Sequence, residues 1–176
     1  MKRILFLLGI ALVGIVMGCS QTPNEPLTNY SVQHANNVVH VRTDYQGDHW
    51  STEEVTHVLR SHQAMRDYYD AFTDDYDFEN SYQDLPSFEA LLDVYDASFF
   101  EGNFIVLLVL EEPSGSYVHQ VTGLSVVEGE LVIELRRTIP EIGTTDMAGW
   151  HIVIELAQGD LEAFESIRVE PTTVKK

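Results

Sequence analysis

The sequence predicts an α+β fold with a mainly antiparallel sheet and two amphipathic helices. Two segments with an apolar helical stripe come first, within residues 61–73 and 87–95. Four strand-like segments follow over residues 104–156, joined by connections rich in turn residues. We therefore expect a four-strand C-terminal meander. The sequence leaves open whether the meander curls into a sandwich or a half-barrel.

Two strands and two helices are expected in the first half of the domain. β-branched residues favour strands over residues 37–43 and 54–60, although the second segment could also open a helix. Ser61 and Ser87 are suited to cap the two helices. Each helix has apolar residues at i, i+3, i+4 and i+7, namely Met65, Tyr68, Tyr69 and Phe72 in the first and Phe88, Leu91, Leu92 and Tyr95 in the second.

The core is expected in the second half of the domain. Residues 104–110, FIVLLVL, are typical of a strand buried on both faces. The Glu128-Gly129 pair predicts a tight turn between two later strands. The alternation that begins at Trp150 places His151 on the solvent side of its strand. Further strands are predicted over residues 117–127, 130–138, 150–156 and 167–169, with a short helical turn near 161–164.

The N-terminus has the features of a lipoprotein signal peptide. Lys2 and Arg3 precede an apolar run, Ile4–Met17, which is shorter than the roughly 20 residues that span a bilayer. Cys19, the only cysteine of the chain, follows a glycine. This pattern resembles the lipobox of bacterial lipoproteins, in which the cysteine thiol is alkylated by diacylglycerol and the cysteine becomes the first residue.

The resemblance implies a protein held on the extracytoplasmic side of a cell membrane. Residues 1–18 would be the signal peptide, and a lipid anchor carrying acyl chains such as palmitate would be attached to Cys19. Two acyl chains are the number that stable anchoring generally requires. An ordinary signal peptide, or a transmembrane anchor with a chance cysteine, stays open as an alternative. A single cysteine excludes a disulfide framework.

The rest of the chain divides into a tether, one domain and a tail. Residues 19–36 are polar, contain two prolines and lack an apolar period, so we expect a lipidated, flexible tether. Residues 37–170 carry enough apolar and aromatic side chains for the core of a single globular domain. Residues 171–176 follow the last predicted strand and are expected to form a C-terminal tail.

The charge of the chain limits its partners. It has 10 basic and 28 acidic residues, a formal net charge of −18. Loss of the predicted signal peptide removes two basic residues and no acid, which brings the charge to −20. Such a charge argues against binding to nucleic acid or to anionic lipid headgroups. It suits a basic partner or divalent cations, and it is also typical of a well-solvated surface.

The second half resembles a group of secreted lipoproteins of Gram-positive bacteria whose function is uncharacterised. The matching residues are Tyr95-Asp96, Phe99-Phe100, Glu111–Ser116, Pro140-Glu141, Gly143-Thr144, Asp146–Ala148 and Trp150-His151. A strand, a serine-capped helix, a strand and a Ser-Gly-Ser hairpin also resemble the C-terminal domain of the PrcB-like family. That family is known for a lipoprotein that stabilises a cell-surface protease complex. The resemblance implies a protein-binding accessory role and brings no catalytic residues.

The sequence shows no catalytic or metal-binding motif. It has no Gly-x-Ser-x-Gly elbow, and its seven histidines form no His-Glu-x-x-His pair. Asp75, Asp77 and Glu79 imitate the first ligands of an EF-hand loop, but Asn80 and Pro86 stand where glycine and glutamate are required. We therefore expect no metal and no cofactor, while a looser calcium site in this acidic loop stays open.

One group of polar residues is expected to converge at an edge of the sheet. In an antiparallel meander, the connections over residues 111–116 and 139–149 lie at the same end of the strands, and we call these two connections the rim. Loops carried on a rigid sheet often bind partners. The alternative is that the loop only caps the sheet and Trp150 belongs to the core. The candidate binding residues are Glu111, Glu112, Ser114, Ser116, His119, Glu141, Thr144, Asp146 and Trp150.

These observations favour a non-enzymatic, membrane-anchored module that binds an extracytoplasmic protein through the rim. A surface protease or an envelope complex is the partner class that the resemblance implies. Two alternatives stay open: a tethered hydrolase of cell-wall or peptide substrates, and a solute- or cation-binding module. A deep pocket with two close carboxylates, or a Ser–His contact, would favour the hydrolase.

Overall fold

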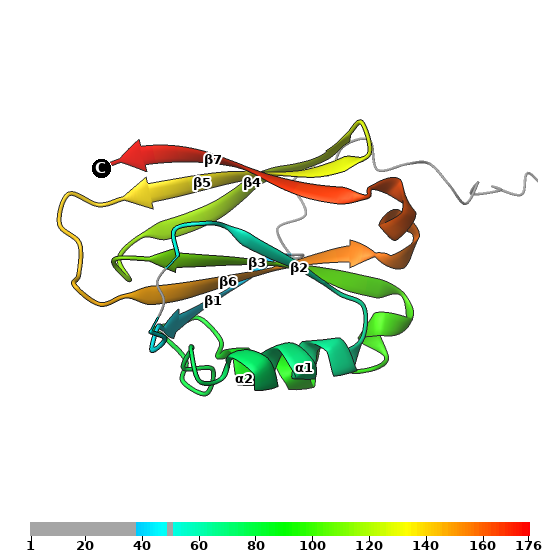
Figure 1. The fold of residues 1–176 in the computed structure, drawn as a ribbon, viewed down its shortest axis with the longest axis horizontal. Helices are drawn as coiled ribbons and strands as arrows, with labels where there is room; N and C mark the ends of the chain where they lie inside the picture. The colour runs from blue at the N-terminus through cyan, green and yellow to red at the C-terminus, as the bar shows by residue number, and fades with distance from the viewer. Residues whose placement is uncertain (1–37, 49–50) are drawn as a thin grey trace, which may run out of the picture.

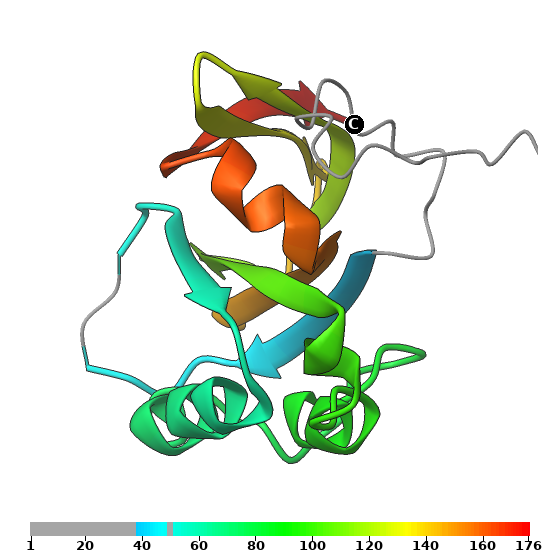
Figure 2. The same ribbon diagram turned by 90° about the vertical axis from the view of Figure 1, so that its right-hand side faces the viewer.

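The computed structural model describes residues 38–48 and 51–176, and this part of the chain forms three layers (Figure 1). A four-stranded sheet is the middle layer, with two helices against one face and a three-stranded sheet against the other (Figure 2). In chain order the elements are β1 (Val38–Asp44), β2 (Val55–Leu59), α1 (His62–Phe72), α2 (Phe88–Val94), the 3₁₀ turn η2 (Phe99–Glu101), β3 (Asn103–Glu112), β4 (Val118–Val127), β5 (Glu130–Ile139), β6 (Ala148–Ala157), the 3₁₀ turn η3 (Gln158–Ala163) and β7 (Ser166–Lys175).

The predicted α+β class is confirmed. The middle sheet has the strand order β1-β6-β3-β2, and every pair in it is antiparallel. The outer sheet has the order β4-β5-β7, in which β4 and β5 are antiparallel and β5 and β7 are parallel. The two sheets do not close into a barrel. The segment 54–60, for which a helix was an alternative, forms strand β2.

The four C-terminal strands are divided between the two sheets and do not form the predicted meander. β3 lies between β2 and β6, whereas β4 pairs with β5 in the outer sheet. The short connection over residues 113–117 therefore crosses from one sheet to the other. Residues 104–108 are fully buried, so β3 needs cover on both faces of its sheet. The helices cover one face and the outer sheet covers the other, which makes a sandwich.

Both predicted helices and their caps are confirmed. The Ser61 side chain accepts a hydrogen bond from the Ala64 backbone N–H at 3.1 Å, and the Ser87 side chain accepts one from that of Ala90 at 3.2 Å. Each serine oxygen thus satisfies one of the backbone donors that the first helical turn leaves free. The carboxylate of Asp96 accepts backbone hydrogen bonds in the same way at the start of η2.

Two apolar cores lie on opposite faces of the middle sheet. The core between the sheets takes one set of alternating side chains from β3 and β6, and the core beneath the helices takes the other set. The inter-sheet core includes Phe104, Val106, Leu108, Leu110, Leu131, Ile133, Leu135, Trp150, Ile152, Ile154 and Leu156. The helix-side core includes Val41, Met65, Tyr68, Phe78, Phe88, Leu91, Leu92, Ile105, Leu107, Val109 and Val153.

The prediction that His151 faces solvent is wrong. Its side chain is completely buried beneath the helices, and a hydrogen bond of 3.1 Å joins its Nε2 to the Tyr68 hydroxyl. Ring centroids of Tyr76, Phe78 and Phe88 lie 4.7–5.5 Å from the imidazole. The alternation along β6 places His151 correctly on the face opposite Trp150, but the helical layer covers that face.

The predicted tail is also wrong, because β7 continues through it. The last predicted strand was expected to end at residue 169, but β7 pairs in parallel with β5 as far as Lys175. Residues 171–176 are exposed and show no apolar alternation, so the sequence carries little strand signal there. Pro171 is compatible with this position because β7 is an edge strand, where a missing backbone N–H can face solvent.

The predicted signal peptide, Cys19 and the predicted tether lie outside the described residues. Among the helices that are described, none has the length and apolar character needed to cross a bilayer. Val38 pairs with Ile154 at one end of the middle sheet, whereas Asp44 pairs with Ala148 at the other. The chain therefore enters the described domain at the end of the sheet opposite the rim.

Candidate functional site

The two connections of the rim do converge at one end of the molecule, on the left of Figure 1. The Thr144 hydroxyl lies 3.1 Å from that of Ser114 and 3.0 Å from that of Ser116. The Ser116 hydroxyl also accepts a hydrogen bond from the Thr144 backbone N–H. The backbone N–H of Gly115 donates to the Asp146 carbonyl at 3.0 Å. Hydrogen bonds therefore lock the two connections into one platform.

An ion pair fastens this platform to the first strand. The guanidinium of Arg42 binds the Asp146 carboxylate, lies 3.2 Å from that of Asp44 and stacks on the ring of Tyr82. Arg42 is only 2% exposed. A side chain at Gly115 would collide with the Arg42 guanidinium and with the Asp146 carboxylate, so any larger residue here would displace this ion pair.

Glu111 and Glu112 point to opposite faces of the middle sheet, as neighbours in a strand do. On the helix side, the Glu111 carboxylate accepts hydrogen bonds from the Tyr76 hydroxyl at 2.9 Å and from the Ser51 backbone N–H at 2.5 Å. Glu112 points into the space between the two sheets and is 3% exposed. The two carboxylates therefore do not form a joint acidic surface on the rim.

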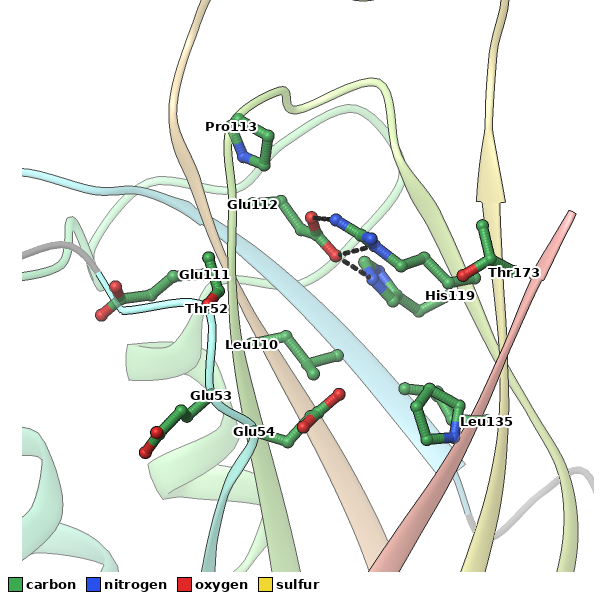
Figure 3. Close-up of a pocket in the computed structure, with 12 residues that line it drawn as sticks. Thr52, Glu53, Glu54, Leu110, Glu111, Glu112, Pro113, His119, Leu135 and Thr173 are labelled. Carbon is green, nitrogen blue, oxygen red and sulfur yellow. Dashed lines mark hydrogen bonds and ion pairs between the residues drawn. The ribbon is translucent and has the colours of Figure 1, made fainter. Parts of the chain in front are cut away.

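A polar cluster of Glu112, His119 and Arg137 occupies the rim end of the inter-sheet space (Figure 3). His119 Nε2 lies 2.8 Å from one Glu112 oxygen, and Arg137 Nε donates to that oxygen at 2.6 Å. A second guanidinium nitrogen of Arg137 pairs with the other oxygen. Arg137 also lies over the Tyr117 ring, 4.8 Å from its centroid. His119 and Arg137 are cross-strand partners, and Arg137 faces Thr173 in β7.

The hydrogen bonds of this cluster fix its protonation. Burial alone would raise the pKa of Glu112, but the hydrogen bonds and positive charge of His119 and Arg137 outweigh burial, so the pKa of Glu112 is lowered. Glu112 is therefore ionised at neutral pH and only accepts hydrogen bonds. The hydrogen bond to Glu112 raises the pKa of Arg137. His119 therefore donates a hydrogen bond from Nε2, and its Nδ1 has no partner among the described residues.

A cavity of about 300 Å³ opens beside the cluster, between the edge strands β2 and β7. Residues just before β2 form one lip, and β7 residues form the other (Figure 3). The side chain of Glu54 points into the cavity, whereas those of Glu53 and Glu111 point away from it (Figure 3). The lining residues are Thr52, Glu53, Glu54, Leu110, Glu111, Glu112, Pro113, His119, Leu135, Arg137, Pro171 and Thr173.

The tip of the rim presents an apolar side chain beside an acidic one. Ile142 is 88% exposed, and Met147, at the other end of the same loop, is also exposed. Glu141 is exposed and makes no hydrogen bond or ion pair with the described residues. Trp150 is buried in the inter-sheet core, and its ring lies 5.3 Å from that of His119. Of the candidate binding residues, Glu141 and Thr144 are therefore the ones on the surface of this tip.

The rim does not assemble a serine nucleophile. The hydroxyls of Ser114 and Ser116 bond to Thr144, and within the described chain no hydrogen bond joins either of them to a histidine. The cavity does hold two carboxylates, Glu54 and Glu112, but that of Glu112 is fully engaged by His119 and Arg137.

The acidic loop after α1 is held by its own side chains. The carboxylate of Asp77 accepts hydrogen bonds from the Asn80 backbone and side-chain amides at 3.2 and 2.7 Å. Within residues 38–48 and 51–176, no three acidic, histidine or cysteine side chains lie close enough to hold a metal ion.

Arg42, Arg137 and Tyr76 are site residues that the sequence analysis did not single out. One signal for Arg137 was present, since Leu131, Ile133 and Leu135 alternate inward and the next inward position is 137. The same rule predicts that His119 points inward, because it lies two positions before the buried Val121 on β4. Arg42 and Tyr76 gave no such signal, because their partners are distant in sequence.

Comparison of the chain with protein-family models, with curated proteins and with solved structures finds no match. The resemblances to secreted lipoproteins and to the PrcB-like family therefore stay predictions.

Proposed function

We propose that the protein is a membrane-anchored, extracytoplasmic binding module without catalytic activity, and that the tip of the rim docks a partner protein. The N-terminal lipobox pattern supports the anchor. The observation that carries the proposal is the locked platform of Ser114, Ser116 and Thr144 that presents the exposed Ile142.

The rigidity of the platform favours binding. An apolar anchor contributes most to affinity when it is held in its bound position beforehand, because less conformational entropy is lost on association. Three hydroxyls, the Gly115–Asp146 backbone hydrogen bond and the buried Arg42 hold this loop. Most single exposed apolar residues are neutral features of a surface, but few stand on a loop restrained in this way.

The point at which the chain enters the domain also favours the rim as the surface that binds a partner. A lipid anchor at Cys19 would be joined to Val38, which lies at the end of the middle sheet opposite the rim. The rim is thus the end of the domain farther from the point where the tether is attached, where the membrane would obstruct a partner least. The charge of −18 favours a partner with a basic surface, since opposite charges increase the rate of encounter.

Site-specific photo-crosslinking in intact cells tests this proposal. A photoreactive residue at position 141 should give a discrete adduct with one envelope protein, and Ile142→Ser should abolish that adduct. The matched control is a probe at position 93 with Val94→Ser, because Val94 is 62% exposed on α2, away from the rim. Equal adducts from both positions, or an adduct at 141 that survives Ile142→Ser, would contradict docking at the rim.

A further inference from the structure

We propose that the cavity between β2 and β7 binds an aliphatic ammonium or guanidinium group. The site is separate from the tip of the rim, so the proposal does not depend on docking there. It rests on the shape of the cavity and on the carboxylate of Glu54, which points into it without a hydrogen bond or ion pair among the described residues.

The cavity suits a short aliphatic chain with a polar end. Its volume of about 300 Å³ lies at the small end of the range for organic ligands. Leu110, Leu135 and Pro171 provide apolar surface that can contact methylene groups. Glu54 and the Glu112 cluster supply the polar surface, so one ligand can satisfy both kinds of wall.

The charge inside the cavity selects a cation. The carboxylate of Glu112 is neutralised by Arg137. That of Glu54 forms no hydrogen bond or ion pair with the described residues, and it interacts with the Arg137 charge only at longer range. Among the described residues, the donors to Glu111, close behind the wall, are uncharged groups. The net charge of the lining is therefore negative, and the free carboxylate that points into the space is Glu54 (Figure 3).

Ammonium and guanidinium groups also match the hydrogen-bonding character of the Glu54 carboxylate. A carboxylate only accepts hydrogen bonds, and both of these cations only donate them. His119, which is 4% exposed and lines the cavity, is already engaged through Nε2 by the Glu112 carboxylate.

Anions and metal ions fit this site less well. Two nitrogens of the Arg137 guanidinium are already bound by the Glu112 carboxylate, and the carboxylate of Glu54 would repel an anion. A metal ion needs several ligands in one place, and the described side chains provide no such group of three. An organic cation requires only one carboxylate and an apolar wall, which the cavity contains.

Such a cation could come from a free amine or from a lysine or arginine side chain of a polypeptide. The two sources share the chemistry of the charged end and differ at the other end of the aliphatic chain. A free diamine has a second charge there, whereas a side chain continues into a peptide backbone. Two probes, 1,5-diaminopentane and Nα-acetyl-lysine-N-methylamide, distinguish the sources.

Calorimetric titration of the full chain in a non-ionic detergent tests the site. We expect both probes to bind, and Glu54→Gln to weaken binding about tenfold, since it removes a charged acceptor. The control variant is Glu101→Gln, an exposed acid on η2, which should leave binding unchanged. Nα,Nε-diacetyl-lysine-N-methylamide, which lacks the positive charge, should not bind. Tighter binding of the lysine compound assigns the natural ligand to a polypeptide, and tighter binding of the diamine assigns it to a free amine.

A second variant keeps the test independent of Glu54. Thr173→Lys places a cation on the β7 lip of the cavity, next to Arg137 in register, and should abolish binding of both probes. The proposal is overturned if neither probe binds at concentrations on the order of 10 mM, or if Glu54→Gln and Thr173→Lys bind them like the unaltered chain.

Discussion

Arg42 and Asp146 are separated by 104 residues and form an ion pair that joins the first strand to the rim. Arg42 is buried on β1, and Asp146 belongs to the loop between β5 and β6. The pair therefore links the middle sheet to the loop that presents Ile142. The geometry of the rim therefore depends on Arg42, a residue of β1 that lies outside it.

Removal of the Asp146 charge should weaken both the fold and the rim. Asp146→Asn leaves the buried Arg42 with Asp44 as its remaining anionic partner, and we expect a loss of about 2–3 kcal/mol in the free energy of unfolding. Urea denaturation measures this loss. Glu141→Gln, an exposed acid of the same loop, should change the stability by less than about 0.5 kcal/mol. Equal effects of the two variants would show that the ion pair is not what holds the loop.

Acid should destabilise the protein through His151. Burial, with a smaller effect of His57, lowers the pKa of His151 to about 3, against 6.5 for an exposed histidine. Between pH 6.5 and pH 3, His151 therefore binds a proton in the unfolded chain but not in the folded chain. The stability contributed by neutral His151 is complete above pH 6.5 and is lost as pH falls toward 3.

Replacement of His151 by phenylalanine should remove this part of the pH dependence. Between pH 7 and pH 5 we expect the unaltered protein to lose about 2 kcal/mol more stability than His151→Phe. The rings of Tyr76 and Phe88 surround His151, so phenylalanine keeps an aromatic ring in this site and removes the group that titrates. Urea midpoints at the two pH values measure the difference. Parallel pH profiles would mean that His151 does not limit acid stability.

The turn between β4 and β5 should tolerate a stabilising substitution. Glu128 has a φ of 53° and Gly129 one of 80°, so both central residues are in the left-handed region. Asparagine is favoured over glutamate there, and Glu128→Asn should raise the free energy of unfolding by about 0.5–1 kcal/mol. Glu128→Gln removes the same charge but keeps the unfavourable backbone geometry. If Glu128→Gln stabilises equally, charge and not conformation is the cause.

Loss of Cys19 should release the protein from the membrane. If the thiol carries the lipid, Cys19→Ala should eliminate incorporation of labelled palmitate and move the protein from the membrane to the soluble fraction. Ser20→Ala alters the neighbouring residue and should leave both unchanged. Palmitate labelling that persists in Cys19→Ala would place the lipid elsewhere.

The elements of the fold could be predicted because each depends on local signals. Ser61 and Ser87 begin the helices as expected, and the alternation from Leu131 to Leu135 marks the buried face of β5. The convergence of the rim connections followed from strand directions alone. The two connections converge even though β3 and β4 belong to different sheets, because both join strand ends at the same end of the molecule.

The pairing of the strands and the layers that cover each face of the middle sheet could not be predicted, because both depend on residues distant in sequence. Nothing in the connection over residues 113–117 shows that it crosses between sheets. The continuous apolar run of β3 does indicate cover on both faces, and that cover is also what buries His151. The rim carries less negative charge than its composition suggests, because Arg42 neutralises Asp146 and Arg137 neutralises Glu112.

The parallel pairing of β7 with β5 determines where fusions to this protein can be placed. The two strands end together, and the Lys176 backbone N–H donates to the Ile139 carbonyl at the start of the rim loop. A fluorescent protein or affinity tag joined after Lys176 would therefore stand beside Glu141 and Ile142 and obstruct access to them. An epitope inserted at the Glu128-Gly129 turn would lie at the other end of the outer sheet and leave the rim accessible.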